Sequence, residues 1–431
     1  MMSISALTFI LIAILISFGV PIAASITLSA IIALIFLSPT SLNVIPIMMS
    51  QGLNSFLLLA LPMFMLVGKI MEIGGSSRRI FNFANSLVGW VHGGIGIVTV
   101  TASMIFGGIS GSSVADAGSL GRITTKAMQE YGFPPGYASA LAVSSSTLAV
   151  IIPPSILLVL YGVSANQSVG TLLAAGLLPG IIIGIALMIV NYIIAKKNNW
   201  KASHAFSIRN VIITFKKGIL ALITPIILLG GIFSGIFTAT EGAAIAVVYC
   251  IFISYFIYKD LTLKDLWIAI KESARDSSVI LFLLAGASLV SHILTIEQIP
   301  HRLATYIIAH SPNDVVTMTG IVVLLLIAGM FLDPASSIVI LVPIFLPIAI
   351  SLGYSPVHFG VIFIGALAIG LITPPVAPCL LAICRVTGLQ VEDIFKDLIK
   401  FIITLIIVLI LLVIFKDISL LLPRLFFDYN F

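Results

Sequence analysis

Two apolar stretches of the chain are interrupted by small and polar residues whose types suit ligand binding inside a membrane. Residues 107–113 read Gly-Gly-Ile-Ser-Gly-Ser-Ser, and residues 332–337 read Leu-Asp-Pro-Ala-Ser-Ser. Hydrocarbon offers no water to an unpaired amide or carbonyl, so unwound chain persists there only where protein encloses it. Paired interruptions in two halves of a chain indicate the substrate site of a secondary transporter.

A pair of serines ends each interruption and precedes a predicted helix. The pairs are Ser112 with Ser113 and Ser336 with Ser337. A serine at this position caps the helix, and the N-terminal amides and dipole then favour a negative charge. We interpret the two pairs as a site for a substrate carboxylate. The alternative is that these serines only cap helices and let helices pack closely.

Two adjacent prolines follow each interruption, Pro153-Pro154 in the first half and Pro374-Pro375 in the second. Proline lacks an amide donor, so it frees the carbonyls of the preceding turn, residues 148–152 and 369–373. Free carbonyls, a helix C-terminal dipole and nearby hydroxyls predict a hard-oxygen site for a small cation such as sodium. The hydroxyls are those of Ser144, Ser145, Ser146, Thr147 and Thr373. A simple packing kink is the alternative.

Two acidic residues accompany the interruptions. An acid at membrane depth costs on the order of 3 kcal/mol, so it is a functional candidate by default. Asp333 is predicted to be a sodium ligand, and no capping role is predicted for it. For Asp116 two roles stay open, as a sodium ligand or as the acidic partner of a capping box begun by Ser113. Glu241 is predicted to cap a helix with Thr238 or Thr240.

The composition places these residues in an all-α polytopic membrane protein. Sixty per cent of the residues are hydrophobic, 9% are charged and the mean hydropathy is +1.24. The net charge of +5 is therefore attributed to loops that set orientation, and no nucleic-acid surface is predicted. No nucleophile triad, paired-carboxylate or phosphate-loop pattern is present, so we expect no enzyme activity and no cofactor besides coupling sodium ions. The three cysteines have no metal-ligand spacing.

The two halves align as an internal repeat. Arg79, Ser112 and Pro153 match Arg302, Ser336 and Pro374 at a nearly constant offset. Each repeat is expected to hold a re-entrant hairpin and a Pro-Pro broken helix. The predicted divisions are N-terminal scaffold helices (1–54), a first repeat (55–195, hairpin about 94–130, broken helix about 137–163), an amphipathic cytoplasmic linker (196–217), scaffold helices (218–277), a second repeat (278–400, hairpin about 317–351, broken helix about 357–385) and a C-terminal helix (401–431).

The distribution of basic residues predicts the orientation. If both hairpins are re-entrant and the 196–217 linker is cytoplasmic, only Arg302, Lys416 and Arg424 of the 21 Lys and Arg residues fall outside. This bias obeys the positive-inside rule and places the N-terminus on the periplasmic side. The first hairpin then enters from the cytoplasm and the second from the periplasm. The repeats are therefore expected to be inverted, with their tips meeting near the midplane.

The motifs resemble those of the large membrane subunit of tripartite ATP-independent periplasmic (TRAP) transporters. They span nearly the whole chain in order: Phe18-Gly-Val-Pro-Ile-Ala23, Leu61-Pro-Met-Phe64, Gly107-Gly-Ile-Ser-Gly-Ser-Ser-Val-Ala-Asp116, Ile151-Ile-Pro-Pro-Ser155, Gly235-Ile-Phe-Thr-Ala-Thr-Glu241 and Ile372-Thr-Pro-Pro375. In the turn at 235–241, position 239 is alanine, where the resemblance predicts proline. This difference affects a helix cap and not the proposed site.

The resemblance implies sodium-coupled transport of an organic acid across the bacterial inner membrane by an elevator-type motion. It implies two partners, a small four-helix membrane (Q) subunit and a periplasmic substrate-binding protein (P subunit). By the same likeness, Ser110, Ser112 and Asp116, with Gly111 between the serines, form one sodium site, and Asp333 with Thr373 forms another. The cargo implied is a sialic acid or a C4-dicarboxylate, with sialic acid favoured on general likeness alone.

Two other classes of membrane protein are compatible with the sequence. One is a self-sufficient sodium–dicarboxylate symporter that needs no binding protein. The other is a non-transporting membrane scaffold, for which broken helices would be unnecessary.

Overall fold

The computed structural model describes residues 3–37, 42–200, 202, 205–300, 302–303, 305, 313–429 and 431, and its regular structure is helical throughout these ranges. Eight of the described helical segments are long and apolar enough to cross a membrane. They are Phe56–Ile73 (the 3₁₀ turn η1, Phe56–Leu59, with α4, Ala60–Ile73), α10 (Val169–Lys197), α11 (Ile208–Phe233), Ala239–Ile257 (α12, Ala239–Phe252, with the π-helical turn η3, Ile253–Ile257), α13 (Leu263–Ile296), α15 (Asp314–Phe331), α16 (Pro334–Ser351) and α19 (Val391–Ile414).

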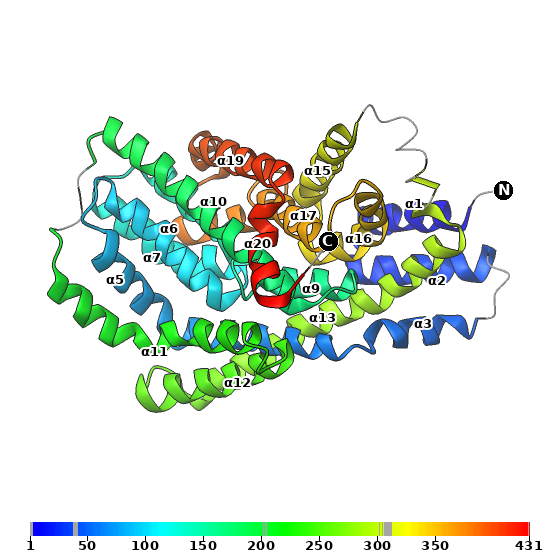
Figure 1. The fold of residues 1–431 in the computed structure, drawn as a ribbon, viewed down its shortest axis with the longest axis horizontal. Coiled ribbons are helices and arrows are strands. Elements are labelled where there is room, and N and C mark those ends of the chain that lie inside the picture. Colours follow the sequence, from blue (N-terminus) through cyan, green and yellow to red (C-terminus); the bar gives the residue numbers. More distant parts are fainter. Residues whose placement is uncertain are drawn as a thin grey trace.

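Shorter helices complete the described chain. They are α1 (Ile4–Ser17), α2 (Ile22–Leu37), α3 (Val44–Leu53), α5 (Ser76–Val88), α6 (Gly94–Ser110), α7 (Ser113–Glu130), α8 (Pro135–Ser146), the 3₁₀ turn η2 (Thr147–Val150), α9 (Ile156–Ser164), α17 (Pro356–Gly370), α18 (Pro378–Thr387) and α20 (Asp417–Phe427). In Figure 1, α5, α6 and α7 lie on the left, α1, α2 and α3 lie on the right, and α9 and α17 lie near the middle.

Both halves contain the helix breaks that the sequence predicted. The first interruption separates α6 from α7, and the second separates α15 from α16. The bonds Pro153–Pro154 and Pro374–Pro375 are both cis and lie between α8–η2 and α9 and between α17 and α18. The second helix of each hairpin packs against the helix that follows the other half's Pro-Pro pair, α7 against α18 and α16 against α9. The two halves therefore interlock around the breaks.

Three predicted element boundaries are wrong because helices continue through polar sequence. The predicted amphipathic linker 196–217 does not end before the scaffold helix. Residues 208–217 contain no proline and form the first part of α11, which runs unbroken from Ile208 to Phe233. The boundary at 277/278 falls inside α13, which begins at Leu263 behind a Thr262–Asp265 capping box. The boundary at 400/401 falls inside α19, and the C-terminal region contains both the end of α19 and α20.

The predicted cap at Glu241 is confirmed. The Thr238 amide donates to Glu241 Oε2 at 2.8 Å, and the Glu241 amide donates to Thr238 Oγ1 at 3.3 Å. This reciprocal pair is a capping box that begins α12. Ala239, at the first helical position, does not disturb it.

Candidate functional site

The tip of the first hairpin is held in shape by Gly111 and by the Pro-Pro pair of its own half. Gly111 has φ +61°, a left-handed conformation that ends α6. A Cβ added to Gly111 would lie 2.9 Å from the Pro154 carbonyl oxygen. Ser112 caps α7 by accepting a hydrogen bond from the Ala115 amide at 3.4 Å. The tip can therefore pack against Pro154 only with glycine at position 111.

Asp116 is buried behind this tip without the partner that a capping role would give it. Its side chain is 1% exposed, and neither oxygen accepts a hydrogen bond of normal geometry from any described residue. The side chains of Ser103 on α6 and Cys379 on α18 are close enough to interact with it. Because Ser112 is the cap, Asp116 stands one position too far along α7 for a capping box. The capping alternative is therefore wrong.

At the second tip the acidic residue is itself the cap. Asp333 Oδ2 accepts hydrogen bonds from the amides of Ala335 at 3.0 Å and Ser336 at 3.4 Å. This corrects the expectation that Asp333 has no capping role, since two main-chain donors of α16 now share its charge. Ser336 and Ser337 are both buried, and the Ser337 hydroxyl has no hydrogen-bond partner within the described chain.

A cavity of about 330 Å³ joins the two tips. Ser112 and Ser113 line it from the N-terminus of α7, and Asp333, Pro334 and Ala335 line it from the N-terminus of α16. The structure thus brings together the two helix starts that the sequence singled out. Ser336 and Ser337, the next two residues of α16, are buried and are not part of the lining.

The hydroxyls near the Pro-Pro pairs keep acceptor capacity. Ser145 donates to the Leu141 carbonyl at 2.7 Å, and Ser146 donates to the Val143 carbonyl at 2.8 Å. Thr373 donates to the Ile369 carbonyl at 2.7 Å. Each hydroxyl hydrogen is used within its own helix, so the oxygen lone pairs remain able to ligate a cation.

Fewer carbonyls are free at the breaks than the sequence predicted. In the first break, the Leu148 carbonyl accepts from main-chain amides, and the Val150 carbonyl accepts from the Ser155 hydroxyl at 2.5 Å. In the second break, the carbonyls of Ile369, Gly370 and Leu371 accept hydrogen bonds. Partial rewinding and caps satisfy these groups, as buried carbonyls require. No cluster of three His, Cys, Asp or Glu side chains occurs in the described ranges.

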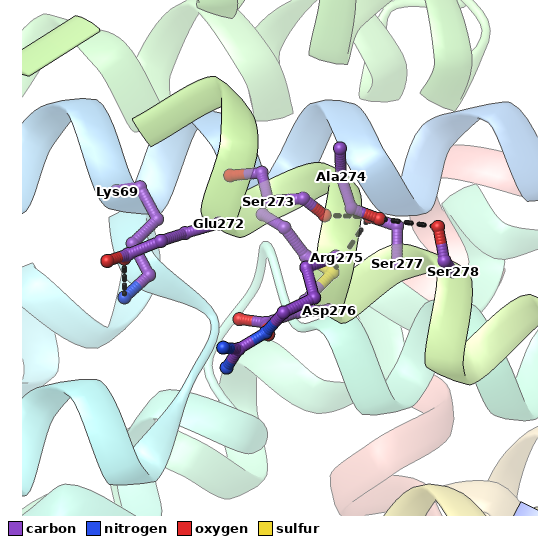
Figure 2. Close-up of polar contacts among 9 residues, drawn as sticks. Lys69, Glu272, Ser273, Ala274, Arg275, Asp276, Ser277 and Ser278 are labelled. Atoms are coloured by element: carbon purple, nitrogen blue, oxygen red, sulfur yellow. Dashed lines mark hydrogen bonds and ion pairs between the residues drawn. The ribbon is translucent and has the colours of Figure 1, made fainter. Parts of the chain in front are cut away.

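Another wall of the cavity comes from α13, which the predicted boundary at 277/278 divided between the scaffold and the second repeat. Asp276 and Met65 line this cavity and also a neighbouring one of about 390 Å³ that reaches Lys69 and Ser273. Figure 2 shows Asp276 beside Arg275, whose Nε lies 3.4 Å from Asp276 Oδ1, and Lys69 paired with Glu272. The Lys69–Glu272 distance is 3.1 Å.

Asp276 is a site residue that the sequence reasoning missed. It falls at the end of the predicted scaffold region 218–277, and no role is predicted for it from the sequence. The available signal was the spacing of Ser273, Asp276 and Ser277, which places three polar side chains on one helix face. The Ser277 hydroxyl donates to the Ser273 carbonyl at 2.6 Å, so this face belongs to one continuous helix.

Comparison with known proteins gives consistent results along the chain. The model of the family "Tripartite ATP-independent periplasmic transporter, DctM component" matches residues 9–418. The sialic acid TRAP transporter large permease protein SiaM of Vibrio cholerae is 38% identical over 412 residues, which are 96% of each protein. The C4-dicarboxylate TRAP transporter large permease protein DctM of Pseudomonas aeruginosa is 38% identical over 367 residues, covering 85% of this chain and 86% of the relative.

Two solved structures share the fold at low sequence identity. The YdaH transporter of Alcanivorax borkumensis superimposes with a TM-score of 0.65 at 14% identity, covering 91% of this chain and 90% of that one. MtrF of Neisseria gonorrhoeae, described as belonging to a class of antimetabolite efflux pumps, gives 0.66 at 12% identity, covering 95% and 94%. The described helices therefore adopt the multi-span transporter fold of these two proteins.

Proposed function

Because the chain belongs to the DctM component family of tripartite ATP-independent periplasmic transporters, we propose that it is the large permease subunit for sodium-coupled uptake of an organic acid across the bacterial inner membrane. The family is one of transporters, and the chain is not an enzyme. In this proposal it works with a small four-helix Q subunit and a periplasmic substrate-binding P subunit.

The observation that carries this proposal is the cavity shared by the two hairpin tips. The N-terminal ends of α7 and α16 both line it. The positive dipole ends of these two helices favour an anion without a basic side chain. In our proposal the substrate carboxylate is held there, with Ser112 and Ser113 as hydroxyl donors from the first tip. Ser336 and Ser337 support the second tip from behind.

Coupling to sodium is supported by the chemistry of Asp116. A buried carboxylate without hydrogen bonds is costly unless a cation neutralises it. We place one sodium ion with Asp116, Ser110, Gly111 and Ser112, and the hydroxyls of Ser145 and Ser146 extend this oxygen-rich region. A second ion is proposed at Asp333 and Thr373. The sodium ions are coupling ions, and no other cofactor is part of the proposal.

The interlocked halves support an elevator motion. Each hairpin packs against elements of both halves, so α6–α9 and α15–α18 can move as one body. The proposed scaffold consists of α1–α4, α10–α13 and the C-terminal helices. In this arrangement the repeats are inverted, the hairpins are re-entrant and the N-terminus faces the periplasm. The two tips then cross the bilayer together, whereas Met65 and Asp276 stay with the scaffold.

The class of cargo is proposed from Asp276. This acid and the two helix starts line the same cavity. Its neighbour Arg275 is 80% exposed, so the guanidinium neutralises the charge of Asp276 only weakly. A second carboxylate on the substrate would be repelled by Asp276, whereas hydroxyl or amide groups would donate hydrogen bonds to it. We therefore favour a sialic acid-type sugar acid over a C4-dicarboxylate.

Reconstitution into liposomes tests the proposed function. The chain would be inserted with its Q subunit, supplied with the P subunit loaded with labelled sialic acid or succinate, and driven by an inward sodium gradient. Uptake is expected only with both partners and with sodium. Uptake that continues unchanged when choline replaces sodium at constant pH would overturn the coupling. Uptake by the chain alone would favour the self-sufficient symporter instead.

A further inference from the structure

A second large cavity lies between α5 and α11, away from the hairpin tips. Its volume is about 1000 Å³. The lining is dominated by basic, amide and hydroxyl side chains, namely Arg78, Arg79, Asn82, Asn85, Asn210, Thr214, Lys216 and Lys217, with Tyr258 and Asp260. Such a set of donors converging on one space is suited to a phosphate-bearing ligand.

The cavity has an excess of positive charge that the protein does not neutralise. Asp260 is the single acid in the described lining, and it is already paired with Arg79 at 2.7 Å. The Arg79 guanidinium also lies over the Tyr258 ring, 3.8 Å from its centroid. Among the described residues, no acidic side chain forms an ion pair with Arg78, Lys216 or Lys217. Three cations therefore face the cavity without a counter-ion.

The cavity lies at the level where a lipid headgroup would be. Helix α11 has 26 residues, so it is about 39 Å long, which exceeds the roughly 30 Å of hydrocarbon. Lys216 and Lys217 directly precede its apolar part, Thr214 lies less than one turn before them and Asn210 lies nearly two turns before them. The lining thus sits at the end of the apolar span and not within it.

Apolar side chains beside the cavity offer a surface for acyl chains. Ile212, Ile213 and Phe215 on α11 are 48%, 42% and 40% exposed. On the neighbouring elements, Leu87 and Ile257 are 40% and 47% exposed. A ligand with a charged head and apolar tails would contact both kinds of surface.

The walls of the cavity are fixed to one another. The hydroxyls of Ser86 and Thr214 are 2.6 Å apart, and the rings of Phe83 and Phe215 have centroids 5.6 Å apart. These contacts join α5 to α11 along the cavity. Arg79 donates to the Gly75 carbonyl at 3.1 Å, which holds the start of α5. The basic side chains are therefore presented by a formed pocket and not by a loop.

We propose that this cavity is a specific binding site for the headgroup of an anionic phospholipid. Arg78, Lys216 and Lys217 bind the phosphate oxygens, the asparagines donate to the glycerol or phosphate oxygens, and the acyl chains lie along α11. Basic pockets between membrane helices bind acidic headgroups in this way. Loop charges that only set orientation would need no cavity lined with amide donors.

The test compares two variants with the same loss of charge. The purified chain would be placed in nanodiscs of phosphatidylcholine doped with phosphatidylglycerol, and bound lipid would be counted by native mass spectrometry. The site variant is Arg78→Gln/Lys216→Gln/Lys217→Gln. The control is Arg209→Gln/Lys264→Gln/Lys271→Gln, which removes three exposed cations outside the cavity. Melting curves of both variants report whether they fold.

Wild type and control are expected to retain phosphatidylglycerol over phosphatidylcholine, and the site variant is expected to bind it on the order of a hundredfold more weakly. Equal retention of phosphatidylglycerol by the site variant and the control, with both folded, would overturn the proposal. So would equal retention of the two lipids by wild type. Displacement of bound lipid by millimolar glycerophosphate would assign the site to a soluble phosphate instead.

Discussion

The two hairpin tips have the same break but satisfy it with opposite chemistry. At the first tip a neutral residue, Ser112, caps α7, and the acid Asp116 is left buried without a hydrogen bond. At the second tip the acid Asp333 is the cap, and two amides share its charge. A charge that main-chain donors satisfy needs no cation for stability, whereas an unsatisfied one does. We therefore expect the two proposed sodium sites to depend on their acids to different degrees.

The largest effect is expected from Asp116→Asn. Removing the charge should weaken sodium activation of uptake by at least roughly a hundredfold, because the ion loses a buried partner worth about 3 kcal/mol. In sodium-free buffer the same variant should melt at the same temperature as wild type or a higher one, because asparagine carries no acid whose ionised form is destabilised by burial. Sodium titrations of uptake and melting curves measure both effects.

Asp314→Asn, at the exposed start of α15, is the control for Asp116→Asn and should change neither quantity. Normal sodium activation in a folded Asp116→Asn protein would remove Asp116 from the sodium site.

At the second tip, Asp333→Asn and Asp333→Ala distinguish the contribution of helix capping from that of the negative charge. Asparagine keeps a side-chain acceptor for the amides of α16, so stability should change by less than about 0.5 kcal/mol, whereas alanine should cost about 1 kcal/mol. Both should weaken sodium activation by about tenfold, less than Asp116→Asn, because the amides already hold the second acid. The two tips would prove equivalent if Asp333→Asn matched Asp116→Asn in sodium affinity and in melting behaviour.

The wall of the cavity formed by α13 is tested by Asp276→Asn. Removing this charge should let a C4-dicarboxylate compete about tenfold better for uptake, as expected for one repulsion relieved at an effective dielectric near 20. The matched control is Asp265→Asn, which removes the same charge from α13 outside the cavity. Unchanged competition by the dicarboxylate would show that Asp276 does not select the cargo.

Glycine is required at the first tip and not at the second. Gly111→Ala should destabilise the protein by about 1–3 kcal/mol, because alanine meets a left-handed φ and the nearby Pro154 carbonyl oxygen. Gly132→Ala is the control, since Gly132 has a similar φ of +81° with nothing near its Cβ position. Denaturant or thermal unfolding of both variants measures the loss of stability. An equal loss in both would mean that the close approach to Pro154 contributes nothing to the requirement for glycine.

The smallest effect concerns Glu297, which holds the start of α1 by the same amide contacts that Asp333 makes with α16. Burial raises the pKa of this carboxyl, but hydrogen bonds from Ser5 and Ile4 outweigh burial and hold its pKa below the usual value. A lowered pKa means that the ionised form stabilises the fold above about pH 4.5 and that this stability is lost as the pH falls further. Wild type should therefore lose a few tenths of a kcal/mol more than Glu297→Gln between pH 5 and pH 3 in thermal unfolding. Parallel melting curves over this range would contradict the assignment.

Much of the fold follows from local sequence. Apolar runs and Pro-Pro pairs set the helices and their breaks because a membrane span needs about 20 apolar residues and proline cannot continue a helix. The errors lie in 208–217, 263–277 and 391–400, where polar residues are helical beyond the hydrocarbon. A polar helix and a polar loop look alike in hydropathy, and the caps at Ser207, Thr262 and Gln390 distinguish them.

The two interruptions, the serines and acids beside them, and the family resemblance follow from residue type and spacing and could be predicted before folding. The roles of the two acids could not, because they depend on three-dimensional contacts. Whether Asp116 or Asp333 finds an amide depends on which residue begins the helix, and one position of difference along α7 leaves Asp116 without a partner. Asp276 likewise shares a cavity with both tips only because tertiary packing brings α7, α13 and α16, which are distant in sequence, to line one space.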